Sequence, residues 1–479
     1  MAQSIYFGGP ILTMEEPLYA LALVEENGVI RYVGQLEQAL ELAGPQARKV
    51  DLEGRCLMPA FLDPHSHFMA CANSLLQVQL GECADQEELC RRLGEFVQRE
   101  KLQPGEWVRG TGYDQNDLAQ GCPPDRWMLD RACPDHPVVI QHASGHVGVF
   151  NSQAMELLGV DENTPCPQGG VMEKDDQGRL TGYMEENAFL SLLQKVPMRD
   201  LKDLMDALVR AQDRYASYGI ATVQDGMFMD AMLPLYQAML AQKLLKLDVV
   251  AYADPRDCKN IMEQFGDRVG HYKDHVKIGG DKIFLDGSPQ GRTAWMRQPY
   301  AGESDYRGYP TLTDEQVYER MKSALERDVQ LLAHCNGDRA AEQYLSVMER
   351  LERETGRRLR RPVMIHAQLV GRDQLPRLKA LGMIPSFFVA HVYHWGEVHV
   401  KNFGLERAEH ISPAGTACAL GIPFTFHQDS PVIQPNMMET VWCAVNRRTK
   451  TGRLLGEEER ISTLEALKAV SVYAAYQYF

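Results

Sequence analysis

The chain has 479 residues, 44% of them hydrophobic, which is enough to bury a large core in one α/β domain together with a smaller domain. Lys and Arg number 50 against 65 Asp and Glu, and the net charge of -15 disfavours nucleic acids and anionic membranes as partners. No apolar segment reaches the length of a membrane span, and no basic leader with an apolar segment opens the chain, so we expect a cytoplasmic protein. The 11 cysteines show no CxxC spacing, which favours reduced thiols over disulfides.

The first part of the chain alternates short β-like runs with turns. Asn27-Gly28 separates two such runs and is typical of a tight hairpin. We therefore predict a small β domain over residues 1–57. A second domain over residues 58–479 begins within the apolar run "CLMPAFLD".

The segment after the first strand of the second domain departs from its regular pattern. It contains clusters of Gly, Pro and aromatic residues, such as "PGEWVRGTGYDQND" and "GCPPDRW". We interpret residues 68–190, with approximate bounds, as a long insertion at the mouth of the domain.

From about residue 200, apolar strands alternate with amphipathic helices. In "TDEQVYERMKSALERD", for example, Val317, Met321 and Leu325 share one helical face behind the N-cap residue Thr313. Strands separated by helices of this length favour right-handed crossovers and a parallel sheet. About eight strand–helix units fit, which predicts an α/β fold with a (β/α)8 barrel of the TIM type. An open, doubly wound sheet is the structural alternative.

The stretch "FLDPHSHF" places His65 and His67 directly after the first apolar strand. Because strand side chains alternate with period two, both imidazoles face the same way. That arrangement suits two ligands of one metal. A single histidine at a strand end more often has a structural role, so the pair needs support from the rest of the chain.

Further candidate ligands stand at the ends of later predicted strands. They are His334 in "LLAHCNGD", His366 in "VMIHAQL" and Asp429 in "FTFHQDSP". The C-terminal ends of parallel barrel strands meet at one face, where the loops build the active site. Imidazole nitrogens with a carboxylate suit zinc, and Mn and Ni are alternatives.

Lys282 in "DKIFLDGS" is a candidate for bridging two metals. Two cations about 3.5–4 Å apart need an anion between them, and a desolvated lysine amine supplies one when carbon dioxide converts it to a carbamate. Glu186 in "GYMEENA" is the alternative bridge, and a salt bridge is the structural alternative for Lys282. Lys277 is disfavoured, because it precedes a break predicted at Gly279-Gly280.

Taken together, these stretches resemble the amidohydrolase superfamily, in particular the amidohydrolase 3 or YtcJ-like metal-dependent hydrolases, a branch related to N-substituted formamide deformylase. The resemblance covers nearly the whole chain and rests on "LMPAFLDPHSHF", "GHVGVFNSQAM", "KIFLDGSPQGRTAW", "AHCNGDRAAEQYL" and "HQDSPV" in the family's order. It implies a small N-terminal β-sandwich element. Members of this branch usually complete that sandwich with strands that follow the last helix, so residues 1–57 are expected to form part of a composite sandwich.

By position, the resemblance implies that the metal ligands are His65, His67, His334 and His366. It implies that Lys282 is a carboxylated bridge between the metals and that Asp429 is the catalytic acid/base. The implied cofactor is a divalent metal, zinc above all, with one or two ions per chain. Such an ion lowers the pKa of bound water from about 15.7 toward 7, and Asp429 then moves the proton. The expected reaction is hydrolysis of a non-peptide C–N amide bond.

We also expect contacts between the protein and its substrate at the barrel mouth. The residues expected to make them are His142 and His146 in "IQHASGHVGVFNS", Glu186 and Arg292. The expected partner is a small amide, such as an N-acyl or N-formyl compound, and a homodimer is compatible with this branch. The alternatives are hydrolysis of an ester or lactone, an isomerisation in the same barrel, and a catalytically silent barrel that binds a metabolite.

Overall fold

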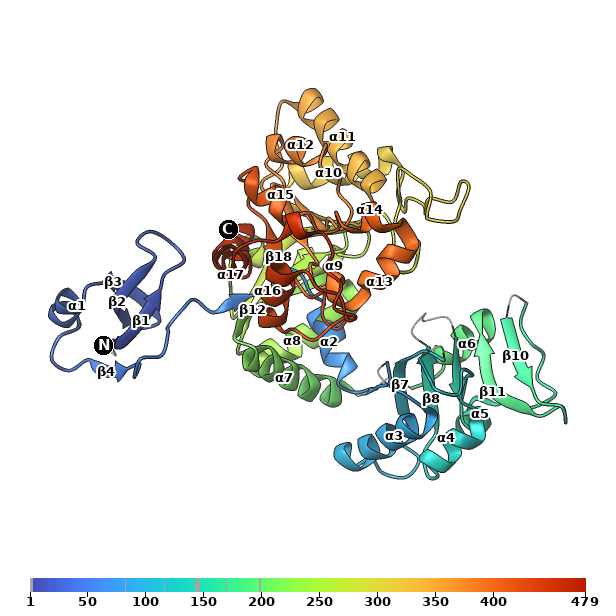
Figure 1. The fold of residues 1–479 in the computed structure, drawn as a ribbon. Helices are drawn as coiled ribbons and strands as arrows, with labels where there is room; N and C mark the ends of the chain where they lie inside the picture. The colour runs from blue at the N-terminus through green and yellow to red at the C-terminus, as the bar shows by residue number, and fades with distance from the viewer. Residues whose placement is uncertain (1–2, 82, 116, 143–146, 169, 198–199) are drawn as a thin grey trace. The chain divides into compact units, whose positions relative to one another are not determined.

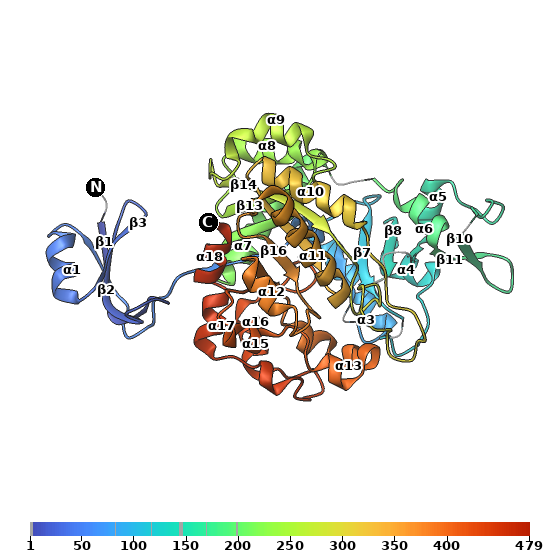
Figure 2. The same ribbon diagram turned by 90° about the horizontal axis from the view of Figure 1, so that it is seen from above.

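The structure is a computed structural model that describes residues 3–479 except 82, 116, 143–146, 169 and 198–199 and the side chain of Glu186. The chain divides into two compact units, Met1–Phe68 with Gln212–Phe479, and Met69–Ala211. Figure 1 shows the ribbon coloured along the chain, and Figure 2 shows it turned by 90°. Within the described residues, no helix has the length and apolar character that crossing a membrane requires.

The N-terminal residues form a four-stranded sheet with the strand order β3-β2-β1-β4. The predicted hairpin at Asn27-Gly28 is confirmed, because β2 and β3 pair antiparallel across it and the two residues have φ angles of 52° and 82°. Small apolar side chains of α1 pack against the sheet. The second layer of the expected sandwich stays a prediction. The elements are β1 (Gln3–Leu12), β2 (Tyr19–Glu26), β3 (Val29–Gly34), α1 (Leu36–Ala43) and β4 (Arg48–Asp51).

The main sheet has eight strands that lie in sequence order, each parallel to its neighbour. The backbone N–H of His67, after β5, donates to the carbonyl of Ser430, after β18, at 2.9 Å and so links the first and last strands. The chain therefore forms the predicted TIM-like barrel, and its C-terminal strand ends share one face. The strands are β5 (Phe61–Leu62), β12 (Ile220–Phe228), β13 (Asp248–Ala253), β14 (Val276–Phe284), β15 (Gln330–Cys335), β16 (Val363–His366), β17 (Ile384–Phe387) and β18 (Thr425–Phe426).

Helices follow the barrel strands, and Figure 2 shows them around the labelled strands β13, β14 and β16. Helix α10 begins behind Thr313, whose hydroxyl accepts the N–H of Gln316 in a capping box, and it buries Val317, Met321 and Leu325 as predicted. The helices are α2 (Phe68–Ser74), α7 (Leu201–Ser217), α8 (Leu233–Ala241), α9 (Lys259–Phe265), α10 (Asp314–Glu326), α11 (Asp338–Thr355), α12 (Leu375–Ala380), α13 (His391–Phe403), α14 (Leu405–Ala408), α15 (Ala414–Ala419), α16 (Met437–Asn446), α17 (Thr463–Ala469), α18 (Val472–Tyr478) and the 3-10 helices η1 (Asp230–Met232), η2 (Gly266–Arg268) and η3 (Glu457–Glu459).

Strand β14 runs through Gly279 and Gly280, so the predicted break at this pair was wrong. A Cβ atom on Gly279 would come within 2.5 Å of the ring of Tyr252, and one on Gly280 within 2.0 Å of the carbonyl oxygen of Gln330. Both glycines therefore reflect the close approach of neighbouring strands rather than a turn. The uninterrupted strand carries Lys282 to its C-terminal part.

Residues 69–211 contain a six-stranded sheet with the order β10-β11-β9-β8-β7-β6. Helices α3 and α4 pack with β7 and β8 in one apolar cluster, and α5 and α6 belong to a second cluster that includes the opposite face of β8. Figure 1 shows α3 and α4 beside β7 and β8. The Gly and Pro clusters of this segment thus separate short strands that the sequence pattern did not predict. The elements are β6 (Val78–Gln79), α3 (Gln86–Glu100), β7 (Val108–Tyr113), α4 (Arg126–Ala132), β8 (Val138–His142), β9 (Val147–Phe150), α5 (Ser152–Leu158), β10 (Gly170–Lys174), β11 (Leu180–Glu185) and α6 (Glu186–Leu193).

Helix α13 buries two histidines against each other. Nδ1 of His391 lies 3.0 Å from Nε2 of His399, and the rings stack with their centroids 5.2 Å apart. His399 is fully buried, and burial lowers its pKa to about 3, because little water is present to solvate an imidazolium. Both rings are therefore neutral in the folded barrel near neutral pH.

We expect the metal-free protein to lose stability as the pH falls from about 7 to about 5. In this window the unfolded chain takes up a proton at residue 399, whose ordinary pKa is about 6.5, whereas the folded chain does not. The stability is therefore fully present above this ordinary pKa and falls below it, by up to about 1.4 kcal/mol per pH unit for this one group. His399→Gln removes the titration, so the unfolding free energy should depend less steeply on pH, by the equivalent of about one proton.

Urea unfolding of the barrel at several pH values measures this slope. The same substitution at His271, which is exposed, controls for the replacement of an imidazole by an amide as such. An identical slope for the parent chain and for His399→Gln would contradict the expectation.

Candidate metal centre

His65 and His67 follow β5 and converge on the carboxylate of Asp429, which follows β18. The Nε2 atoms of His65 and His67 lie 3.4 Å and 3.3 Å from Asp429 Oδ1. The two imidazole rings meet edge to face, with their centroids 5.2 Å apart. His65 is buried, whereas the side chain of His67 keeps 26% exposure. The first and last barrel strands thus bring two imidazoles and one carboxylate together.

Lys282, on β14, places its amine in the same cluster. Its Nζ lies 3.4 Å from Nε2 of His65, and the residue is 1% exposed. Burial lowers the pKa of Lys282 to about 7, so a large share of the amine is uncharged near neutral pH. Lys277, by contrast, lies near the start of the same strand, where its Nζ donates to the carbonyl of Tyr478 at 2.7 Å.

Strands β15 and β16 add His334 and His366. Nε2 of His366 lies 3.0 Å from Nδ1 of His334 and 3.9 Å from Oδ2 of Asp429. Nε2 of His334 faces the carbonyl oxygen of Gly287 at 3.2 Å; a proton on this nitrogen leaves Nδ1 with a lone pair. Burial lowers the pKa of His334 to about 4 and the pKa of His366 well below its usual range, so both rings are neutral near pH 7.

Asp429 is the anionic group of the cluster. Burial acts to raise its pKa, but the contacts with His65 and His67 outweigh burial and hold the pKa well below its usual range. Its Oδ1 is buried and, although two imidazole nitrogens lie 3.3 and 3.4 Å away, makes no hydrogen bond of regular geometry with the described residues. A buried, unsatisfied carboxylate oxygen costs free energy, and a cation held between this oxygen and the imidazoles would remove that cost.

The donor set fits a divalent metal. One donor atom from each of His65, His366 and Asp429 lies within 4.8 Å of the other two. Neutral imidazoles with a carboxylate are the ligands that zinc and similar first-row ions prefer. His366 and Asp429 also have positive φ angles, 71° and 54°, a backbone strain that clusters at functional sites.

Asp286 fixes the loop after β14 to the end of β15. The carboxylate is 2% exposed and accepts backbone N–H hydrogen bonds from Trp295, Asn336 and Gly337, at 2.9, 2.9 and 2.7 Å. This loop also supplies the carbonyl of Gly287, which faces a ligand-type histidine. The contacts of Asp286 therefore hold one wall of the cluster in place.

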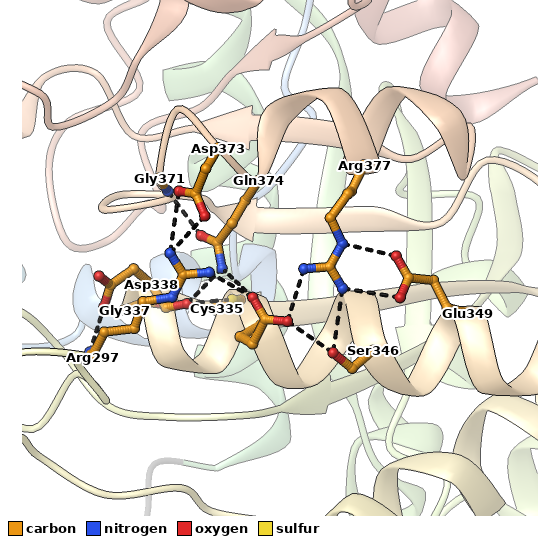
Figure 3. Close-up of polar contacts among 11 residues, drawn as sticks. Arg297, Cys335, Gly337, Asp338, Ser346, Glu349, Gly371, Asp373, Gln374 and Arg377 are labelled. Atoms are coloured by element: carbon orange, nitrogen blue, oxygen red, sulfur yellow. Dashed lines mark hydrogen bonds and ion pairs between the residues drawn. The ribbon is translucent and has the colours of Figure 1, made fainter.

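A network of polar side chains ties the same loop to helices α11 and α12 (Figure 3). Asp338 accepts the N–H of Arg297 at 2.7 Å, and the guanidinium of Arg297 lies 2.9 Å from Asp373. Arg377 on α12 pairs with Glu349 on α11 at 2.8 Å. Single pairs of this kind contribute little, but the connected set holds the loop at Arg297, through both its backbone N–H and its guanidinium.

The other residues singled out in the sequence were expected to contact substrate. His142 ends strand β8 in the unit of residues 69–211. His146 and the side chain of Glu186 lie outside the described residues. Arg292 lies in the loop after β14, where its guanidinium pairs with Glu303 at 2.7 Å. The contacts of these residues with substrate stay predictions.

Two buried partners of the ligand-type histidines escaped the sequence analysis. Oε1 of Gln224 lies 2.6 Å from Nδ1 of His65, and Nε2 of His427 lies 3.2 Å from Nδ1 of His366. Groups in such positions fix the orientation of a ligating ring. Strand alternation could have indicated His427, since it precedes Asp429 by two residues, whereas Gln224 carries no signal beyond a polar residue in an apolar strand.

The sequence and the fold are similar to those of known hydrolases. A family model described as "Amidohydrolase family" matches residues 48–479. The protein YtcJ of Bacillus subtilis (strain 168) is 27% identical over 482 residues, covering 97% of this chain and 88% of that protein. The N-substituted formamide deformylase of Arthrobacter pascens is 26% identical over 476 residues, covering 95% and 86%. Among solved structures, an uncharacterized metal-dependent hydrolase from Pyrococcus horikoshii OT3 is 28% identical with a TM-score of 0.81, covering 100% of this chain and 93% of that chain. The chain therefore belongs to the amidohydrolase family.

Proposed function

We propose that this chain is a metal-dependent amidohydrolase that cleaves a C–N bond, other than a peptide bond, in a small amide. The observation that carries the proposal is the gathering of ligand-type side chains around one largely buried carboxylate at the C-terminal ends of the barrel strands, the face on which such barrels build active sites. The residues are His65, His67, Lys282, His334, His366 and Asp429.

In this proposal His65 and His67 hold one divalent ion, and His334 and His366 hold a second, with zinc as the preferred metal. When bound, such an ion lowers the pKa of water toward 7 and polarises a carbonyl oxygen. Burial keeps the rings of His65, His334 and His366 neutral near pH 7, so each presents a lone pair without first losing a proton.

Asp429 is the proton carrier in the proposed reaction. Its carboxylate is ionised near neutral pH and accepts a proton from the water whose oxygen attacks the substrate carbonyl. The same carboxyl group then donates that proton to the departing nitrogen. The C–O bond forms when the water oxygen adds to the carbonyl carbon, and the C–N bond breaks afterwards, as the nitrogen takes up the proton. The products are a carboxylic acid and an amine.

Lys282 supplies the anion that two neighbouring cations need between them. An ammonium group cannot serve, but burial lowers the pKa of Lys282 to about 7 and makes the uncharged amine available. Its nitrogen bonds to the carbon of carbon dioxide and loses a proton, which gives a carbamate with two oxygens. Glu186 is the alternative bridge.

The relative from Arthrobacter pascens is named for its action on N-substituted formamides. We therefore propose N-formyl and N-acyl derivatives of small amines as the first substrate class to test. The matching esters and lactones belong in the same panel, because the proposed chemistry at the carbonyl does not by itself select the leaving group.

We expect Asp429→Asn to lower kcat on any substrate of this panel by about 10²- to 10⁴-fold, because the amide cannot carry the proton. The change in kcat is measured from the rate at which the amine product is released, with the amine quantified by chromatography. Asp305→Asn changes an exposed aspartate of the same unit and should keep the parent rate. Full turnover by Asp429→Asn would show that another group carries the proton.

A carbamate on Lys282 should be visible by isotope labelling. We expect ¹³C-bicarbonate to give a carbamate signal in the NMR spectrum of the parent chain, and Lys282→Met to lose it. Lys277→Met is the matched control, since Lys277 is also a buried lysine of β14 with a lowered pKa, and it should keep the signal. A signal that survives Lys282→Met would assign the carbamate elsewhere, and a parent chain without one would favour Glu186 as the bridge.

A further inference from the structure

His427 is a fully buried histidine directly after β18 that the proposed chemistry does not use. Its two ring nitrogens face different partners. Nε2 lies 3.2 Å from Nδ1 of His366, and Nδ1 lies 2.9 Å from the hydroxyl oxygen of Ser386 on β17. Its ring also packs beside those of Phe388 and His65, with centroids 5.3 Å and 5.2 Å away.

If His366 binds a metal, the positions of the protons on His366 and His427 follow from which nitrogen of His366 faces the other ligands. Nε2 of His366 faces Nδ1 of His334 and Oδ2 of Asp429, so this is the nitrogen that must present a lone pair to a cation. The proton of a neutral His366 ring then sits on Nδ1. That N–H points at Nε2 of His427, which must accept it and therefore carries its own proton on Nδ1. The remaining N–H donates to the oxygen of Ser386.

We propose that His427 is a positioning residue, which accepts a hydrogen bond from Nδ1–H of His366 and thereby holds that ring with Nε2 turned toward the metal. The inference rests on the proposed function, because it assumes that His366 is a metal ligand. A ligating histidine commonly makes this second contact with a carboxylate, a backbone carbonyl or water. Here the acceptor is a neutral imidazole, so the contact adds no negative charge to the site.

The strand geometry explains how one short segment supplies both groups. His427 and Asp429 both follow β18 directly, and both reach the ring of His366: Nε2 of His427 lies 3.2 Å from its Nδ1, and Oδ2 of Asp429 lies 3.9 Å from its Nε2. Ser386 pairs with Thr425 in the register of β17 and β18, which brings its hydroxyl beside the residue that follows β18. His427, just past the end of β18, thus contacts Ser386 on the neighbouring strand β17 and His366 at the end of β16.

The competing explanation is that the ring of His427 only fills space among its aromatic neighbours. Two substitutions separate the explanations. His427→Phe keeps an aromatic ring of similar size but offers no acceptor, whereas His427→Gln places an amide oxygen near the position of Nε2. If the hydrogen bond is what matters, glutamine should rescue the site and phenylalanine should not.

The test is the affinity of the full chain for Zn²⁺ alone, measured by competition with a chelator after the metal has been removed. We expect His427→Phe to bind Zn²⁺ about 10- to 100-fold more weakly than the parent chain, and His427→Gln to stay within about 3-fold of it. The visible absorption bands of Co²⁺-loaded protein should change in His427→Phe and remain parent-like in His427→Gln. His136→Phe and His136→Gln are matched controls at a buried histidine in the unit of residues 69–211, and both should keep the parent affinity and spectrum.

Equal Zn²⁺ affinities and unchanged Co²⁺ bands in His427→Phe and the parent chain would overturn the inference. Equal losses in His427→Phe and His427→Gln would also overturn it, because packing rather than the acceptor would then be responsible. If His427→Phe does not fold, Ser386→Ala is used instead. This variant removes the hydrogen-bond partner of Nδ1–H of His427 and should weaken Zn²⁺ binding about 3-fold. An unchanged Zn²⁺ affinity in Ser386→Ala would contradict the proposed positioning role of His427. A parent chain that binds no Zn²⁺ at this site would instead refute the proposed function, and the inference with it.

Discussion

The largely buried carboxylate of Asp429, which lies among the imidazoles of His65, His67 and His366, is the constraint around which the barrel is organised. Its pKa is held well below the usual range, so it carries a negative charge, yet one of its oxygens makes no hydrogen bond of regular geometry with the described residues. The nearby amine of Lys282 is only partly charged near neutral pH. The cluster therefore has lone pairs and negative charge in excess of positive charge, which is the electrostatic condition for binding a cation.

Several barrel strands each supply one or two of the side chains that surround this carboxylate. The first and last strands are each only two residues long, and a hydrogen bond from His67 to Ser430 joins the segments that follow them. Behind the cluster, Asp286 gathers three backbone N–H groups from two separate loops. Buried polar contacts of this kind position the ligands more tightly than apolar packing alone, because each has a required distance and direction.

Much of this arrangement could be predicted from the sequence. The spacing of His65 and His67 and the polar residues at strand ends were enough to predict a cluster, because the C-terminal ends of parallel strands meet at one face. The limits also have physical causes. In the sequence, the pair Gly279-Gly280 predicts a turn. In the structure, the absence of side chains at these positions lets the ring of Tyr252 and the backbone of Gln330 pack closely against β14.

The partners behind the ligands were harder to predict. Gln224 and His427 act on residues that lie far away in the sequence, and their roles depend on which ring nitrogen faces which atom. Alternation along a strand gives the side on which a side chain lies, but not its partner. The strands of residues 69–211 were missed for another reason: they are short, and frequent glycine and proline residues hide their period.

The account depends on a cation being held by this cluster, and anomalous X-ray diffraction from crystals grown with zinc would test that most directly. Data collected on either side of the zinc absorption edge should give a strong difference peak between the carboxylate of Asp429 and the imidazoles of His65 and His366. A fully ordered barrel with no peak there, or with zinc held only at other residues, would contradict the central claim.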